Sequence, residues 1–156
     1  RTWFPDYSLP EGRDWWATYS KAFRELGFDG AWLDMNDPST GAAEVDDMLF
    51  QHGKWPHWTY HNQYATGMAQ ATRAGFLAAR PDERPFLLAR SAYTGFSRFT
   101  ALWTGDNHSN WHHLAPGLTK SWPGPGTKRA ASSPSCATMP MRARRAKSLG
   151  FLALRH

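Results

Sequence analysis

Cysteines, long apolar runs and, in one part of the chain, acidic residues are scarce in this sequence. Cys136 is the single cysteine among 156 residues, which excludes an internal disulfide framework and a zinc site built on several cysteines. No run approaches the ~18 apolar residues of a membrane span, so no membrane association is expected. The N-terminus lacks a basic-then-apolar signal pattern, which says little about compartment because the chain begins at Arg1 without a Met.

Acidic residues are missing from the C-terminal part. Residues 1–115 hold all 13 acidic residues and 10 of the 18 Lys and Arg residues, a net charge of −3. Residues 116–156 hold the other 8 basic residues and no acid, a net charge of +8. The basic character of the chain therefore belongs to its last part, and the acidic body gives no support for nucleic-acid binding.

Aromatic residues, in contrast, are abundant. The 9 Trp, 9 Phe and 5 Tyr residues make up 15% of the chain, and the apolar share of 41% is enough for the core of one domain. Many Trp residues favour flat, partly wet ring surfaces of the kind that stack on sugars or nucleobases. Ordinary aromatic packing is the alternative, and composition does not choose between the two.

The stretch 8–27 predicts the first helix. Ser8 is a candidate N-cap, Pro10 stands near the first turn, and Gly27 stands where a helix stops. Apolar residues recur at helical spacing at Trp15, Tyr19, Phe23 and Leu26. We expect this row, and Trp15 with Trp16, to pack against the rest of the domain.

Three apolar runs predict buried strands over 29–34, 84–90 and 99–106. Polar and apolar residues do not alternate in these runs, as expected for strands buried on both faces, and each run ends in a charged residue. A polar loop is expected over 35–59. Helical spacing over 60–79, at Tyr60, Tyr64, Met68, Ala71 and Phe76, predicts a second helix. Strands separated by helices indicate an α/β fold with a parallel sheet, in which polar groups at the strand C-terminal ends carry the chemistry.

The link from Arg90 to Phe99 is short for a parallel crossover, which usually needs roughly a dozen residues. A single helical turn around 93–97 would have to make this connection. After Leu114 the sequence becomes rich in Pro, Gly, Ser, Ala and Arg. Residues 116–156 are interpreted either as a disordered basic tail or as sequence that does not continue the fold, such as the product of a shifted reading frame.

Two carboxylates end two different predicted strands, Asp34 in "GAWLDMNDPS" and Asp106 in "ALWTGDNHSNW". The C-terminal ends of strands in one parallel barrel converge on one mouth, so these residues can face each other across a pocket. Two facing carboxylates are what glycoside hydrolysis requires, one to attack the anomeric carbon and one to protonate the leaving oxygen. Spacing alone also allows each Asp simply to cap the next element.

The strings "FPDYSLPEGRDWW", "DGAWLDMNDPS", "YHNQYATGMAQAT" and "RPFLLARSAYTGFSRFTALWTGDNHSNW" resemble, in this order, conserved blocks of glycoside hydrolase family 31, which contains the α-glucosidases. The resemblance covers residues 3–114. It implies a partial (β/α)8 TIM barrel, roughly its third to sixth strands, followed by an irregular tail. With the other strands missing, we expect exposed sheet edges, poor solubility and an inactive isolated chain.

The resemblance also implies site residues. Asp34 matches the catalytic nucleophile and Asp106 the general acid/base. Substrate-binding positions are matched by Arg90, Trp32, Met35 and Trp103, although an ion pair for Arg90 and core packing for the others remain alternatives. Asn36 and Asn107 are expected to support them by hydrogen bonds. Asp37 departs from the family, where many members have Glu in "DMNEP", and its shorter side chain could still cap or pair.

Histidines suggest a different site. His108, His112 and His113, with Asp106, could hold a zinc ion, and His57 and His61 also stand four apart. A catalytic zinc needs three protein ligands, no Glu lies between the paired histidines as in H-E-x-x-H, and the family resemblance implies no metal. We therefore expect neither a metal nor another cofactor.

The resulting hypothesis is a retaining α-glucosidase-type hydrolase that acts on an oligosaccharide or α-glucoside. Rival activities within the family are those of an α-xylosidase, an α-galactosidase-like enzyme or a transglucosidase. From another class, a non-catalytic carbohydrate-binding remnant could use the Trp surface. The oligomeric state is left open.

Overall fold

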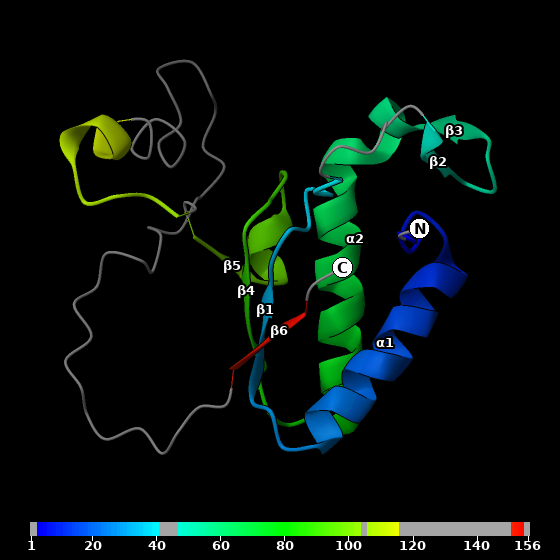
Figure 1. Cartoon of the computed structure of the whole chain (residues 1–156). Coiled ribbons are helices and arrows are strands. Elements are labelled where there is room, and N and C mark those ends of the chain that lie inside the picture. The colour runs from blue at the N-terminus through cyan, green and yellow to red at the C-terminus, as the bar shows by residue number, and fades with distance from the viewer. Residues whose placement is uncertain (1–2, 41–46, 104–105, 116–150, 155–156) are drawn as a thin grey trace, which may run out of the picture.

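The computed structural model describes residues 3–40, 47–103, 106–115 and 151–154 (Figure 1). Its elements are α1 (Pro10–Glu25), β1 (Gly30–Leu33), β2 (Leu49–Phe50), β3 (Trp55–Pro56), α2 (His57–Ala79), β4 (Phe86–Ala89), the 3-10 helix η2 (Phe96–Arg98), β5 (Ala101–Leu102) and β6 (Phe151–Leu154). Both predicted helices are confirmed, and all three predicted strands form. Within the described residues no helix has the length and apolarity to cross a membrane.

Within the described residues, the main sheet has four strands in the order β5-β4-β1-β6. All its pairings are parallel, with Gly30 opposite Phe86 and Leu88 opposite Ala101. The predicted parallel sheet is therefore confirmed. The short link between β4 and β5 contains η2, a single turn, close to the segment where a turn was expected.

The C-terminal part differs from its expected irregular form at one place. β6 pairs with β1 in parallel register, with Gly30 opposite Phe151, so the strand that carries Asp34 is not an edge strand (Figure 1). The run FLAL is apolar throughout, as expected for a buried strand, whereas the preceding sequence is rich in Pro and Arg. Residues 116–150, to which most of the tail interpretation applies, lie outside the described residues.

Helices α1 and α2 lie on one side of the sheet, with α2 between the sheet and α1 (Figure 1). Ala31 and Leu33 of β1, and Leu87 and Ala89 of β4, are buried, in the alternation expected for one face of a strand. The core between sheet and helices consists of Tyr7, Ala31, Leu33, Phe50, Tyr64, Ala65, Met68, Ala69, Ala71, Phe76, Leu87, Ala89 and Phe96.

The buried face of α1 is not the one that its apolar spacing predicted. Trp15 is 51% exposed and Tyr19 61%, whereas Ser20 and Arg24 are buried. A Cβ built on Gly75 of α2 would lie 2.2 Å from the carbonyl oxygen of Ala17, so the two helices touch through small residues. This close approach turns the row that includes Ser20 towards α2 and leaves the Trp15 side in solvent.

The start of α1 also differs from the prediction. Leu9 is the N-cap residue and provides no side-chain hydrogen bond. Ser8 instead donates from its backbone N–H to Oδ1 of Asp6 over 3.0 Å. Asp6 also accepts a 2.8 Å hydrogen bond at Oδ2 from the backbone N–H of Gln51, which joins the N-terminal segment to the β2–β3 hairpin. That hairpin lies in the region expected to be a plain loop.

Gly75→Ala is expected to destabilise the chain by about 2–3 kcal/mol, because the clash with Ala17 outweighs the helix propensity of alanine. Gly67→Ala is not a neutral comparison, since its Cβ would meet Tyr7. Ala79→Gly, at the end of α2, is the propensity control and should cost at most about 1 kcal/mol. Urea unfolding of both variants measures the difference, and a Gly75→Ala chain as stable as the parent would contradict this packing.

Three tyrosines form an aromatic cluster between the N-terminal segment and α2. The Tyr7 and Tyr64 rings meet at 5.0 Å between centroids, and Tyr60 contacts Phe50 at 5.0 Å. Burial raises the pKa of the Tyr7 and Tyr64 phenols, and it raises the pKa of Tyr60 to about 12. The cluster thus favours neutral phenols and belongs to the core.

Candidate active site

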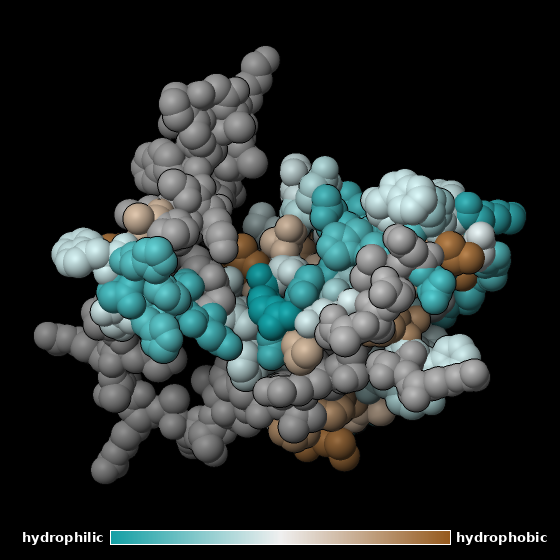
Figure 2. Space-filling view, turned by 45° about the horizontal axis from the view of Figure 1, so that its top comes forward, coloured by the Kyte–Doolittle hydropathy of each residue, from teal (hydrophilic) through white to brown (hydrophobic). Residues whose placement is uncertain are grey.

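The C-terminal ends of β1 and β4 bring together charged groups from two predicted strands. Asp34, the residue after β1, is only 8% exposed, and its Oδ1 accepts a 2.9 Å hydrogen bond from the backbone N–H of Met35. Met35 has φ 57°, a left-handed conformation that turns the chain away directly after the strand. Figure 2, in which this end of the molecule comes forward, shows hydrophilic side chains near the middle of the face.

Arg90, the residue after β4, contacts two carboxylates. Its Nε and Nη2 donate to Oδ1 of Asp37 over 3.1 and 3.0 Å, and Nη2 also donates to Oδ2 over 3.1 Å. Its Nη1 lies 3.6 Å from Oδ1 of Asp34. The expected proximity of Arg90 to the proposed nucleophile is present, and its closest bonds go to the residue at which the sequence departs from the family.

A second pair of contacts fastens the same two strand ends. The Asn36 side chain is fully buried, and its Oδ1 accepts a 3.1 Å hydrogen bond from the backbone N–H of Ser91. The Ser91 hydroxyl donates to Oδ1 of Asp37 over 3.3 Å. Asn36 was expected to support the site, whereas Ser91 was missed because a lone serine after a strand carries no sequence signal.

The remaining predicted wall residues lie beside this network. The Trp32 and Trp103 rings meet edge to face, with centroids 5.3 Å apart. Within the described residues, the buried Trp32 Nε1 and Asn36 Nδ2 have no hydrogen-bond partner. Two donors and two indole rings near Asp34 are suited to a ligand rich in hydroxyl groups, because hydroxyl oxygens accept hydrogen bonds and sugar faces pack on rings.

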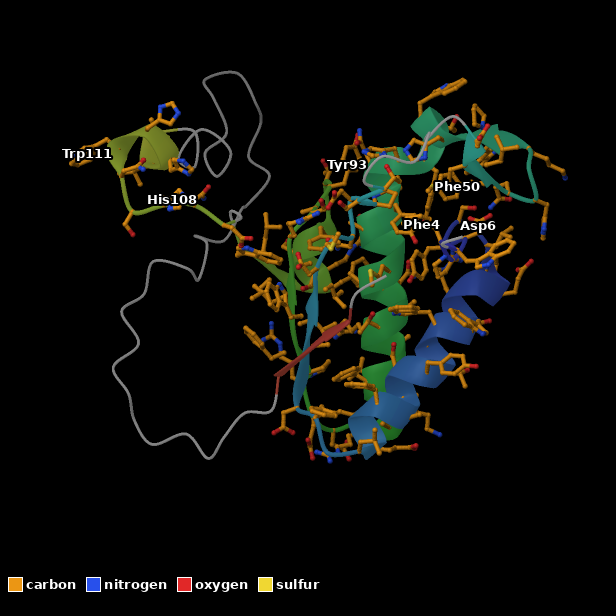
Figure 3. The ribbon with its side chains drawn as sticks, in the orientation of Figure 1. Phe4, Asp6, Phe50, Tyr93, His108 and Trp111 are labelled. Carbon is orange, nitrogen blue, oxygen red and sulfur yellow. The ribbon has the colours of Figure 1, made fainter. Side chains whose placement is uncertain are left out.

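Asp106 is not brought to Asp34 by any contact among the described residues. It is exposed, and the preceding residues 104–105 lie outside the described part. Figure 3 shows His108 and Trp111, on the segment that follows, away from the sheet and α2, whereas Tyr93 lies at the upper end of the sheet. The facing pair of carboxylates therefore stays a prediction.

The histidines of this segment contact one another. The His108 and His113 rings lie 5.2 Å apart, and the His112 and His113 rings 5.8 Å apart. On α2, His57 Nε2 lies 2.6 Å from His61 Nδ1. In the described ranges, no three or more His, Cys, Asp or Glu side chains are grouped so that they could hold a metal ion.

Comparison with known proteins identifies the family to which this chain belongs. The Glycosyl hydrolases family 31 TIM-barrel domain matches residues 1–121. Alpha-glucosidase 2 of Bacillus thermoamyloliquefaciens is 37% identical over 120 residues, which cover 74% of this chain and 15% of that protein. Neutral alpha-glucosidase AB of Sus scrofa is 40% identical over 121 residues, covering 71% of this chain and 12% of that protein.

Comparison with solved structures identifies the same family. A family 31 alpha-glucosidase from Bacteroides thetaiotaomicron is 41% identical with a TM-score of 0.57, over 71% of this chain and 18% of its own. A Flavobacterium johnsoniae dextranase of the same family, solved as a mutant with isomaltotriose, is 28% identical with a TM-score of 0.61; the match covers 70% of this chain and 14% of that chain. The chain thus spans less than a fifth of these relatives. It belongs to glycoside hydrolase family 31 and contains part of that family's TIM-barrel domain.

Proposed function

We propose that this chain carries part of the active site of a retaining α-glucosidase-type hydrolase acting on terminal α-linked glucosides. The observation that carries the proposal is Asp34, a buried carboxylate at the end of β1 with the Arg90 guanidinium 3.6 Å away. The α-glucosidase relatives support the substrate class. Activity belongs to a complete barrel, in which β1, β4 and β5 would stand roughly within the third to sixth strands.

The proposed reaction is a double displacement. A carboxylate oxygen of Asp34 attacks the anomeric carbon, the glycosidic C–O bond breaks, and Asp106 gives its proton to the leaving oxygen. Water then attacks the same carbon and gives a proton to Asp106, and the ester bond to Asp34 breaks. Two inversions return the α anomer. No step needs a metal or an organic cofactor.

Asp34 has one oxygen available for this attack. Both contacts described above fall on Oδ1, and within the described residues no group donates a hydrogen bond to Oδ2. Trp32, Trp103 and Met35 would form the wall around the bound sugar, with Arg90 close to its hydroxyls. The barrel strands that lie outside this chain would complete the pocket and set much of its selectivity.

A second substrate class deserves a test because of the structural neighbours. The Flavobacterium johnsoniae enzyme is a dextranase, and it was solved with isomaltotriose. A panel of α-1,4 and α-1,6 glucosides and an α-xyloside separates the activities within the family. Sugar binding that survives loss of both Asp34 and Asp106 would instead favour a non-catalytic carbohydrate-binding role.

The proposal can be tested by grafting residues 3–115 into the Bacteroides thetaiotaomicron enzyme in place of its matching segment, a protein called here the grafted barrel. We expect it to hydrolyse an aryl α-glucoside. A fluorinated α-glucosyl fluoride, chosen so that the glycosyl ester of the enzyme hydrolyses slowly, should leave a sugar covalently bound to Asp34. Mass spectrometry of the peptides then locates the labelled residue. A folded, active grafted barrel labelled at another residue would refute the assignment.

The isolated chain of 156 residues is the comparison. We expect it to give no turnover, because the pocket needs strands from the rest of the barrel. Turnover by the purified chain would show that this expectation is wrong, and it would leave the assignment of Asp34 in place.

A further inference from the structure

Arg90 lies between two carboxylates that compete for its single charge. Asp37 accepts three hydrogen bonds of 3.0–3.1 Å from Nε and Nη2, whereas Asp34 lies 3.6 Å from Nη1. The guanidinium is planar and rigid, so fixing one of its edges fixes the direction of the remaining corner. Asp37 therefore decides how closely Arg90 approaches Asp34.

Asp37 is itself held in place. The Ser91 hydroxyl donates to its Oδ1, and the buried Asn36 side chain binds the backbone of Ser91. These contacts join residues more than 50 positions apart, at the ends of the neighbouring strands β1 and β4. Asp37, which holds Arg90, is thus fixed to the ends of both strands and does not depend on an exposed loop.

A free Arg90 would have a different partner. Without Asp37, Asp34 would be the nearest carboxylate to Arg90 among the described residues, and a charge-assisted hydrogen bond would draw Nη1 in to about 2.7–2.9 Å. A carboxylate engaged so closely is a weaker nucleophile, because its negative charge is already satisfied by the guanidinium. At 3.6 Å from Oδ1, Nη1 is too far away for such a bond, and Oδ2 of Asp34 stays available to react.

We propose that Asp37 is a positioning residue, which clamps Arg90 by a bidentate ion pair and thereby keeps it from closing onto Asp34. This inference rests on the proposed function, in which Asp34 is the nucleophile. It gives Asp37 a role in the reaction although it does not touch the reacting atoms. Arg90 then has two roles. It contacts the substrate, and it holds a positive charge 3.6 Å from Asp34.

The first test uses the full 156-residue chain and NMR. Asp37→Asn should speed water exchange of the Arg90 Nε–H by about fivefold or more and shift the carboxyl carbon of Asp34. Asp37→Glu, which keeps the carboxylate, should restore slow exchange. Asp82→Asn removes the same charge from an exposed carboxylate outside this network and should change neither signal. A folded Asp37→Asn chain with unchanged Arg90 exchange overturns the proposal.

A reciprocal variant covers the case in which Asp37→Asn does not fold. Arg90→Lys keeps the charge but cannot form the bidentate pair, so the Asp37 carboxyl carbon should shift and the Asp82 carboxyl carbon should not. An unshifted Asp37 carbon in a folded Arg90→Lys chain would show that the pair does not exist in solution.

Kinetics of the grafted barrel separate positioning from folding. Asp37→Asn should lower kcat about tenfold or more while KM changes less than about threefold, and Asp37→Glu should recover most of kcat. An unchanged kcat overturns the role of Asp37. Labelling of a residue other than Asp34 would remove the proposed function while leaving the NMR result on Arg90 as it stands, so the two failures are distinguishable.

Discussion

Asp34→Ala in the grafted barrel is expected to lower kcat/KM for an aryl α-glucoside by about 10⁴-fold or more, because no covalent intermediate can form. Added azide should restore turnover by attacking the anomeric carbon from the face that Asp34 occupied. A single displacement inverts the centre, so the product should be the β-glucosyl azide. Proton NMR of the product identifies the anomer.

Asp106→Ala provides the matched comparison. An aryl leaving group needs little protonation, so the first step should continue, and azide should take the place of water in the second step. The product after two displacements should be the α-glucosyl azide. Opposite anomers from the two variants would establish both roles, and normal hydrolysis by Asp34→Ala would contradict the nucleophile assignment.

Arg24→Ala is expected to have the largest effect on stability, a loss of about 2–4 kcal/mol in the free energy of unfolding. Arg24 is 2% exposed, and its Nη1 donates to the carbonyl oxygen of Phe28 over 2.9 Å. Its Nη2 donates to Glu83 over 2.7 Å, and its guanidinium lies 5.6 Å from the Phe76 ring centre. Truncation removes packing and hydrogen bonds together, between the end of α1 and the start of the sheet.

Arg80→Ala is the control in the same network. Arg80 reaches Asp29 and Glu83 at 3.5 and 3.2 Å, but its side chain is 36% exposed. Its loss should cost at most about 1 kcal/mol, because water replaces an exposed ion pair. Urea unfolding of both variants gives the comparison, and equal losses would mean that burial of Arg24 contributes nothing beyond its charge.

Local patterns predicted the elements well. The spacing of Tyr64, Met68 and Phe76 placed one face of α2 in the core, where all three are buried. The apolar runs around β1 and β4 identified strands of a parallel sheet, and the four quoted strings, taken in order, indicated the family whose TIM-barrel domain matches residues 1–121. These successes depend on short-range properties, namely periodicity, strand-forming residues and motif order.

Contacts between distant residues decided the rest. Which face of α1 is buried depends on how closely Gly75 lets α2 approach, and the apolar spacing of α1 does not encode that distance. The pairing of 151–154 with β1 likewise depends on which strand edge is available.

Local sequence patterns were enough to identify an α/β member of glycoside hydrolase family 31 with a carboxylate at the end of its first strand. The folded structure was needed to show that Arg90 is held by Asp37, 53 positions away in the sequence. The physical reason is that an ion pair depends on distances of a few ångströms between side chains, and those distances exist only once parallel strands set their ends side by side.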